Sequence, residues 1–447
     1  MGEFLQSTIV PAFMRFVNTR GVRAIKDGMM FSMPAIMVGA VYLLLFQLPV
    51  ESLANFVAST GIVPFLSHGY TSTFAITAMI TTVGIAYAWA KNDGWEPLSA
   101  GIISMMVFLI LIPDYVPAGL FDAEGNEVAT LAGLDKTWLG GQGMIGAIIA
   151  GLLTGLIYSW FMKKDITIKM PDGVPDGVAA AFTGLIPAAT ICTGAVVVYA
   201  LCSVIAGQTP IELIYTFLQA PLQGITDSLG GVIIFTALIP LFWFFGVHGA
   251  TVVGAVMGPI NSANMLENQA LVERLMNSGM SRNEAVAAMA ENGGHILSEP
   301  FMNTFNAITG SGITIGLVVF MLVFAKSAQM KQVGKLGIGA GIFNINEPVL
   351  FGTPIVMNPK LLVPFVLAPL FGVTGAYILT MIGFMPYTTG ISVPWTTPPI
   401  LSGFLNVGWQ GALWQAVELV ASFFIYLPFA RSVDQEYLAT EAESEQA

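Results

Sequence analysis

The sequence predicts an all-α polytopic membrane protein of about ten transmembrane helices, with re-entrant hairpins and amphipathic helices in addition. Of 447 residues, 55% are hydrophobic and only 10% are charged, whereas roughly 25% of residues in soluble domains are charged. Long stretches contain no Asp, Glu, Lys or Arg, and about 20 apolar residues suffice for one crossing of the hydrocarbon core. These stretches are 28–50, 137–162, 177–211, 228–266, 300–325 and 361–417.

The remaining composition excludes several function classes. A net charge of −11 argues against a nucleic-acid partner. Cys192 and Cys202 lie in one apolar stretch, so we expect neither a disulfide framework nor a metal site, and we expect no cofactor. The acidic residues gather in a loop at 114–136 and in the tail at 431–447, both of which read as solvated segments.

The N-terminal segment 1–27 reads as an amphipathic interfacial helix. Apolar residues alternate there with Arg15, Arg20, Arg23 and Lys26, a pattern typical of a helix whose basic side faces anionic headgroups. Because basic residues favour the cytoplasmic side, this segment orients everything that follows.

Residues 28–206 form a predicted N-terminal half of five spans that packs and dimerises. The positive-inside pattern puts the lysines after the second and fourth spans in the cytoplasm and the acidic loop at 114–136 outside. The expected spans are 28–48, 71–90, 98–113, 142–162 and 178–206.

Residues 207–430 form a predicted sugar-binding C-terminal half, followed by the acidic cytoplasmic tail 431–447. The stretch 336–359 is broken by Gly and Pro and reads as a re-entrant hairpin, while 267–299 falls outside and contains a capping box that begins at Ser281. Both chain termini then lie in the cytoplasm. The expected spans are 229–246, 249–266, 301–325, 361–384 and 408–430.

Glu347 is the strongest functional candidate. It lies among apolar residues of the hairpin, in the run Asn344-Ile345-Asn346-Glu347-Pro348, and an acid at membrane depth is a functional hypothesis by default. Pro348 helps to break the helix, which frees carbonyl groups for a polar ligand beside Asn344 and Asn346. The structural alternative is an ion pair of Glu347 with Lys335 or Lys360.

His248 is the second catalytic candidate. It is the only histidine of an apolar stretch and lies between Gly246 and Gly249, which permit close backbone approach. A histidine and a carboxylate can together hold a hydroxyl group and accept its proton. A lone histidine on an apolar face is otherwise more often a packing residue.

Aromatic and amide residues supply the remaining substrate-binding candidates. Trp243 and Trp395 can stack on the C–H face of a sugar, or they can be interfacial anchors. The turn Gly310-Ser311-Gly312 is either a backbone-lined turn near substrate or a small-residue packing point. The amide candidates are Gln219, Gln223, Asn303 and Asn306.

Four segments in order resemble the lactose/cellobiose-type IIC permeases of the bacterial phosphoenolpyruvate-dependent sugar phosphotransferase system. They are the loop-and-helix segment that starts at Met170-Pro171-Asp172-Gly173, the run Phe244-Phe245-Gly246-Val247-His248-Gly249-Ala250, the turn Gly310-Ser311-Gly312, and Gly341-Ile342-Phe343-Asn344-Ile345-Asn346-Glu347-Pro348 with Met357-Asn358-Pro359. The resemblance covers essentially the whole chain.

This resemblance implies a multi-pass homodimer in the bacterial inner membrane that binds and translocates a β-linked disaccharide of the cellobiose, diacetylchitobiose or lactose class. The 6-hydroxyl of the sugar would take a phosphoryl group from the phosphocysteine of a IIB protein, charged in turn by a IIA protein. It assigns the site histidine and glutamate to His248 and Glu347, and the sugar-stacking tryptophans to Trp243 and Trp395. We expect the IIB protein to be a separate chain, because both cysteines lie in an apolar stretch.

The residues leave two functions of different classes open. In the first, the chain is the membrane component of a phosphocysteine–sugar phosphotransferase, and whether it counts as an enzyme by itself stays open. In the second, it is a proton-coupled secondary sugar transporter that uses Glu347 and His248 without phosphorylation. Phosphorylated rather than free sugar inside sealed vesicles distinguishes them.

Overall fold

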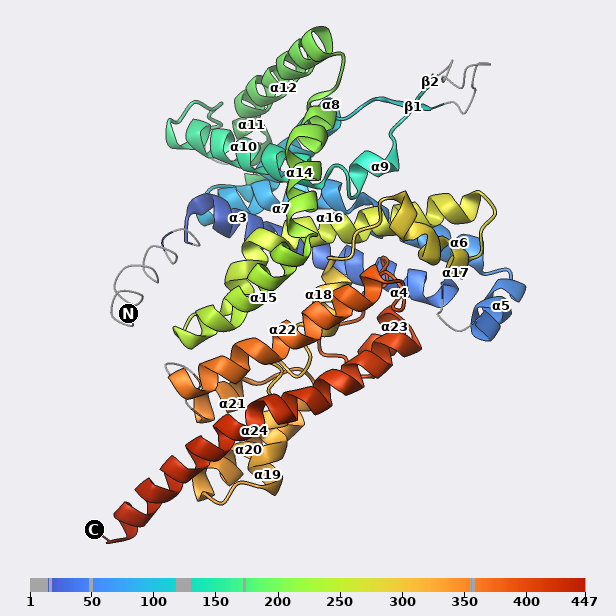
Figure 1. Ribbon diagram of the computed structural model, residues 1–447. Coiled ribbons are helices and arrows are strands. Elements are labelled where there is room, and N and C mark those ends of the chain that lie inside the picture. The colour runs from blue at the N-terminus through green and yellow to red at the C-terminus, as the bar shows by residue number, and fades with distance from the viewer. Residues whose placement is uncertain are drawn as a thin grey trace. The chain divides into compact units, whose positions relative to one another are not determined.

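The computed structural model describes residues 15, 18–47, 51–117, 130–171, 174–353, 355 and 358–446, and within them the fold is almost entirely helical (Figure 1). One short antiparallel ladder joins β1 (Tyr115–Pro117) to β2 (Thr130–Ala132). The chain divides into two units. The N-terminal unit takes the described parts of Ser7–Tyr42 and Phe65–Gln223, and the C-terminal unit takes those of Leu43–Pro64 and Gly224–Ala447.

The N-terminal unit is built around α7, which packs against α3, α8 and α10. Gly28 and Gly84 allow the close crossing of α3 and α7, because a Cβ at either residue would overlap the backbone of the other helix. The hydroxyl groups of Thr82 and Ser104 join α7 to α8 at 2.7 Å. The elements are α3 (Arg20–Met29), α4 (Met33–Phe46), α6 (Val63–Thr71), α7 (Thr77–Asn92), α8 (Pro97–Leu111), α9 (Lys136–Leu139), α10 (Met144–Lys163), α11 (Asp176–Thr183), α12 (Leu185–Ala206), α13 (Pro210–Ile214) and α14 (Ala220–Thr226), with short turns at Met30–Ser32, Phe74–Ile76 and Tyr215–Gln219.

In the C-terminal unit, α22 packs against α15 and α24, and α19 packs against α20 and α24. Trp414 of α24 donates from Nε1 to the carbonyl of Gly372 at 2.9 Å, and Gly375 makes room for its ring. The elements are α5 (Glu51–Ser59), α15 (Leu229–Phe244), α16 (Gly249–Asn277), α17 (Arg282–Ala287), α18 (Glu299–Phe305), α19 (Ile315–Val323), α20 (Ala328–Ile342), α21 (Glu347–Gly352), α22 (Pro359–Met381), α23 (Leu401–Asn406) and α24 (Trp409–Gln446), with a 3-10 turn at Ala288–Asn292.

The helices confirm a multi-pass α-helical membrane protein. Among the described residues, 6 helices are long and apolar enough to cross a membrane, or up to 7 if Pro210–Thr226 and Leu229–Phe244 form one span. The six are Arg20–Phe46, Val63–Asn92, Met144–Lys163, Leu185–Ala206, Pro359–Met381 and Trp409–Glu443. The expected spans at 98–113 and 229–246 are helices of 15 and 16 residues, α8 and α15.

Two expected spans have a different form. The stretch 249–266 is the first part of the 29-residue α16, which contains Pro259 and runs on through Glu267 to Asn277. The stretch 301–325 is split into α18 and α19, because four residues between them have positive φ. These residues are Thr309, Gly310, Gly312 and Ile313.

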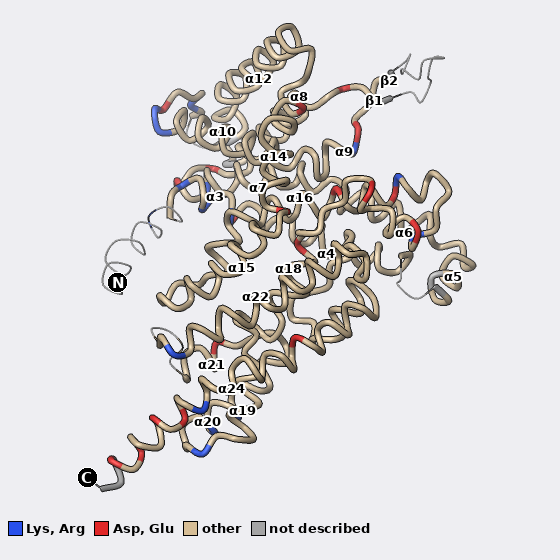
Figure 2. Tube along the Cα trace, viewed as in Figure 1, with Lys and Arg blue, Asp and Glu red and all other residues tan. Residues whose placement is uncertain are grey.

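Many charged residues of the C-terminal unit lie toward its two ends, and a few acidic residues lie between them (Figure 2). One end carries α17 and the other carries α20 with the acidic end of α24. An apolar middle between two charged ends is the distribution that a bilayer requires.

Candidate functional site

The first break in the C-terminal unit lies between α15 and α16. Gly246 has a φ of 76° and donates its N–H to the carbonyl of Trp243 at 2.9 Å, which ends α15 as glycine commonly does. Gly249 begins α16, and a Cβ there would overlap the carbonyl of Ile239. The two glycines therefore hold His248 at a tight corner between the helices.

His248 is the N-cap of α16. Its Nδ1 accepts the backbone N–H of Thr251 at 3.2 Å and lies 3.0 Å from the hydroxyl of Thr251. A ring nitrogen that accepts a backbone N–H carries no proton itself, so this cap places the proton of the neutral imidazole on Nε2. The side chain is exposed, which leaves Nε2–H as a donor for a ligand.

Trp243 connects His248 to the second break. Its ring centroid is 4.4 Å from that of His248 and 6.3 Å from that of Phe351 in α21. Trp243 is buried, and its Nε1 has no hydrogen-bond partner among the described residues. One tryptophan therefore contacts both the histidine and the helix that Glu347 begins.

Asn344 and Asn346 fix the loops around the second break, between α20 and α21. Asn344, with a φ of 64°, donates to the carbonyls of Trp395 and Thr397 at 2.6 and 2.9 Å and accepts the N–H of Thr309 at 2.6 Å. The amide of Asn346 donates to the carbonyl of Ser311 at 2.7 Å. Each asparagine thus joins the α20–α21 corner to another loop of the unit.

The turn Gly310-Ser311-Gly312 requires its glycines both for its backbone conformation and for close packing. Gly310 and Gly312 have φ values of 87° and 84°. A Cβ at Gly310 would overlap the Asn346 side chain, and one at Gly312 would overlap the ring of Phe365. The turn is a tight packing point that also lies directly against Asn346.

Glu347 begins α21 with an exposed carboxylate. That carboxylate forms no hydrogen bond or ion pair with any described residue. The alternative ion pair with Lys335 or Lys360 is not formed among the described residues, where Lys360 pairs with Glu436 of α24 instead. Because the side chain is exposed and has no partner among the described residues, its carboxylate is available to a ligand.

The remaining candidates are distributed over both units. Asn303 and Asn306 lie at α18 and its C-cap, and their side-chain amides bond to no described residue. Trp395 is 48% exposed. Gln219 and Gln223 are buried in the N-terminal unit, where Gln219 bonds to the carbonyl of Gly141 at 2.8 Å and the N–H of Ile145 at 3.1 Å.

A partly buried polar cluster escaped the sequence reasoning. His295 bonds through Nδ1 to Asp227 and through Nε2 to Glu267, both at 3.3 Å, and Asn268 bonds to both backbone groups of His295. Burial alone would lower the pKa of His295, but the hydrogen bonds and charges of the two carboxylates raise it to about 9. The available signal was that Asp227 and Glu267 are the acids that bound the charge-free stretch 228–266.

Two further acids were also missed. Glu299, at the start of α18, is partly buried and accepts the hydroxyl of Ser262 at 3.0 Å. Glu418 of α24 lies against Gly372, and neither of its carboxylate oxygens has a hydrogen-bond partner among the described residues. Glu299 precedes the charge-free stretch 300–325 and Glu418 follows the stretch 361–417, so a search for acids at the ends of charge-free stretches would have found them.

Apolar helices interrupted by polar, glycine-bounded corners define a membrane transporter. The model of the family described as "Phosphotransferase system, EIIC" matches residues 26–369. The chain belongs to this family, and it is a sugar permease of the phosphotransferase system.

Curated relatives and a solved structure align with nearly the whole length of this chain. The chain is 36% identical to the lichenan permease IIC component of Bacillus subtilis (strain 168), over 100% of this chain and 96% of that one. It is 34% identical to the cellobiose-specific EIIC component of Geobacillus stearothermophilus, over 98% and 95%. The crystal structure of the transporter ChbC, the IIC component of an N,N'-diacetylchitobiose-specific phosphotransferase system, superposes with a TM-score of 0.89 at 32% identity, covering 98% of this chain and 99% of that one.

Proposed function

We propose that this permease binds a β-linked disaccharide in its C-terminal unit and presents the sugar's 6-hydroxyl to the phosphocysteine of a IIB protein. The observation that carries the proposal is the position of Trp243, whose ring contacts both His248 and Phe351 of α21. This contact puts an imidazole donor and the helix that starts at Glu347 beside one aromatic ring. The cellobiose and diacetylchitobiose named for the relatives are β-linked disaccharides.

The chemistry follows from the two free groups. Glu347 accepts the proton of the 6-hydroxyl as O6 attacks the phosphorus atom; the O6–P bond forms, the P–S bond breaks, and the cysteine leaves as a thiolate. His248 donates from Nε2 to O6 or to a phosphoryl oxygen, and the proton on Nε2 follows from its capping bond. Trp395, which is exposed, offers a second face for stacking, and Asn303 and Asn306 offer free amides.

The phosphoryl donor is a separate IIB chain in this proposal. Cys192 and Cys202 both lie in α12, an apolar helix of 22 residues, where neither serves as an exposed phosphocysteine. We further propose that the N-terminal half forms a homodimer and that both termini are cytoplasmic. The exposed apolar side chains of α12, with Val204 85% and Ile205 80% exposed, support a surface covered by lipid or a second copy.

Binding of sugars to the purified chain tests the substrate class. Isothermal titration should detect binding of cellobiose, diacetylchitobiose or lactose, and no binding of the α-linked disaccharide maltose. Glu347→Gln should weaken the binding of the best ligand, because a charge-assisted hydrogen bond is roughly twice as strong as a neutral one. Equal binding of maltose, or binding of none of the β-linked sugars, would contradict the proposal.

A further inference from the structure

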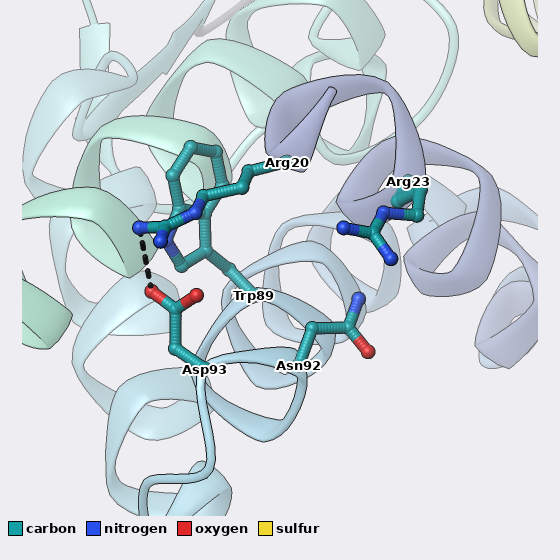
Figure 3. Close-up of a pocket in the computed structure, with 5 residues that line it drawn as sticks. All are labelled: Arg20, Arg23, Trp89, Asn92 and Asp93. Carbon is teal, nitrogen blue, oxygen red and sulfur yellow. Dashed lines mark ion pairs between the residues drawn. The ribbon is translucent and has the colours of Figure 1, made fainter. Parts of the chain in front are cut away.

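A small cavity lies in the N-terminal unit where the first turn of α3 meets the C-terminal end of α7 (Figure 3). Arg20 and Arg23 line it from α3, and Trp89, Asn92 and Asp93 line it from α7 and its C-cap. Its volume is about 150 Å³. We propose that this cavity binds the phosphate group of an anionic phospholipid, at the end of α7 that the proposed topology places in the cytoplasm.

One positive charge at this cavity, that of Arg23, is not balanced by a described acidic residue. Arg20 pairs with Asp93 at 3.6 Å, and Lys26 pairs with Asp27 at 3.6 Å. The guanidinium of Arg23 has no acidic partner among the described residues. The phosphodiester of a lipid headgroup carries one negative charge, and its oxygens fit the planar fork of an arginine.

Neutral donors at the cavity also lack acceptors. Trp89 is 9% exposed, and its buried Nε1–H has no hydrogen-bond partner among the described residues. The Asn92 amide donates one hydrogen to the Asp27 carboxylate at 3.3 Å, and its second hydrogen bonds to no described residue. The first turn of α3 has no side-chain cap, so its backbone N–H groups add a positive partial charge. Asp93 also lines the cavity, but its carboxylate is paired with Arg20. The donors of Arg23, Trp89 and Asn92 that remain without acceptors favour an anionic occupant.

The surface beside the cavity favours a lipid as the source of the phosphate. Met30 and Phe31, at the other end of α3, are 58% and 48% exposed. A ten-residue helix is about 15 Å long, a distance that an acyl chain covers. The headgroup of one lipid can therefore bind at α3 while its acyl chain contacts Met30 and Phe31 in the turn that follows, and free phosphate has no acyl chain to make this second contact.

Native mass spectrometry of the delipidated full chain tests this site. Titration with phosphatidylglycerol should give a discrete one-lipid adduct, and zwitterionic phosphatidylcholine should give at least about ten-fold less of it, since one charge-assisted bond accounts for such a factor. Arg23→Gln should reduce the adduct by a similar factor. Trp89→Phe, which keeps the ring and removes the N–H, should reduce it several-fold.

Lys163→Gln is the matched control, because it removes one exposed positive charge from the same unit outside the cavity. It should leave the adduct unchanged. An equal loss in Lys163→Gln and Arg23→Gln would overturn the site in favour of general surface attraction. Full displacement of the lipid by millimolar inorganic phosphate would show that the cavity binds free phosphate and not specifically a lipid. Thermal unfolding of each variant checks that the variant is folded. If Trp89→Phe does not fold, Arg23→Gln alone decides the result.

Discussion

At the scale of single residues, the proposed reaction uses two side chains, one an acceptor and one a donor, that bond to no substrate-competing group among the described residues. Glu347 offers a carboxylate with no described partner, and His248 offers a donor whose proton position is set by a capping bond to Thr251. A free acid and a fixed donor are the pair that deprotonates a hydroxyl and steadies the oxygen that results.

Replacing Glu347 with Gln should lower sugar phosphorylation by at least about 10²-fold, the usual contribution of a general base. Its thermal unfolding should be unchanged, because no described residue bonds to the carboxylate. Phosphorylation by purified phospho-IIB protein measures the first effect, and Glu443→Gln, at an exposed position of α24, is the control. Near-normal turnover in Glu347→Gln would remove this residue from the mechanism.

The two roles of His248 can be separated by two substitutions. His248→Ala loses the cap and the donor, so it should lose phosphorylation and about 1 kcal/mol of stability. His248→Asn should restore stability, because asparagine is a favoured N-cap, but not phosphorylation. Calorimetry measures the stability of each variant, and phosphorylation by purified phospho-IIB protein measures its activity. If His248→Asn phosphorylates sugar normally, the histidine is only a cap.

At the scale of elements, the corners between helices hold the proposed site residues, and the positions of these corners follow from local sequence only in part. Glycine and proline in 336–359 predicted the break that ends α20 at Ile342 and starts α21 at Glu347. The sequence singled out the turn Gly310-Ser311-Gly312, but the apolar composition of 301–325 also satisfies a continuous helix, and so the stretch was expected to be one span although it is split into α18 and α19.

The cluster around His295 makes the stability of the C-terminal unit depend on pH. Because the pKa of His295 is raised from 6.5 to about 9, its contribution is fully present below pH 6.5 and is lost as the pH rises through about 9. Thermal unfolding of the parent should therefore fall toward that of His295→Gln over this interval. A constant difference between the two proteins from pH 6 to 10 would show that the charged imidazole contributes nothing.

At the scale of the whole molecule, composition and charge distribution predicted the membrane fold and the family motifs predicted the permease. The amide contacts could not be predicted, because Asn344, Asn346 and Gln219 look alike in sequence. In the structure, the side-chain amide of each of these residues donates to a backbone carbonyl of a segment distant in sequence. Which amides remain free is decided by packing, and so Asn303 and Asn306 are now the stronger candidates.

The proposed topology places α17 outside and Lys331 in the cytoplasm, consistent with the opposite ends of the C-terminal unit that these elements occupy. Single cysteines at Asn283 and Lys331, in a background without Cys192 and Cys202, should react with an impermeant thiol reagent on intact cells only at 283. Asn283 is exposed and leaves the capping bond of Ser281 intact. Labelling of a cysteine at position 331 from outside would show that the chain has the opposite orientation in the membrane.

Phosphoryl transfer coupled to entry is the central claim, and sealed right-side-out vesicles test it directly. Vesicles that contain the chain are loaded with phospho-IIB protein and given labelled cellobiose, diacetylchitobiose or lactose outside. For at least one of these sugars, the account predicts that the label accumulates inside as 6-phosphorylated disaccharide, at a rate that Glu347→Gln abolishes. Accumulation of free, unphosphorylated sugar, driven by a proton gradient and indifferent to phospho-IIB protein, would contradict it.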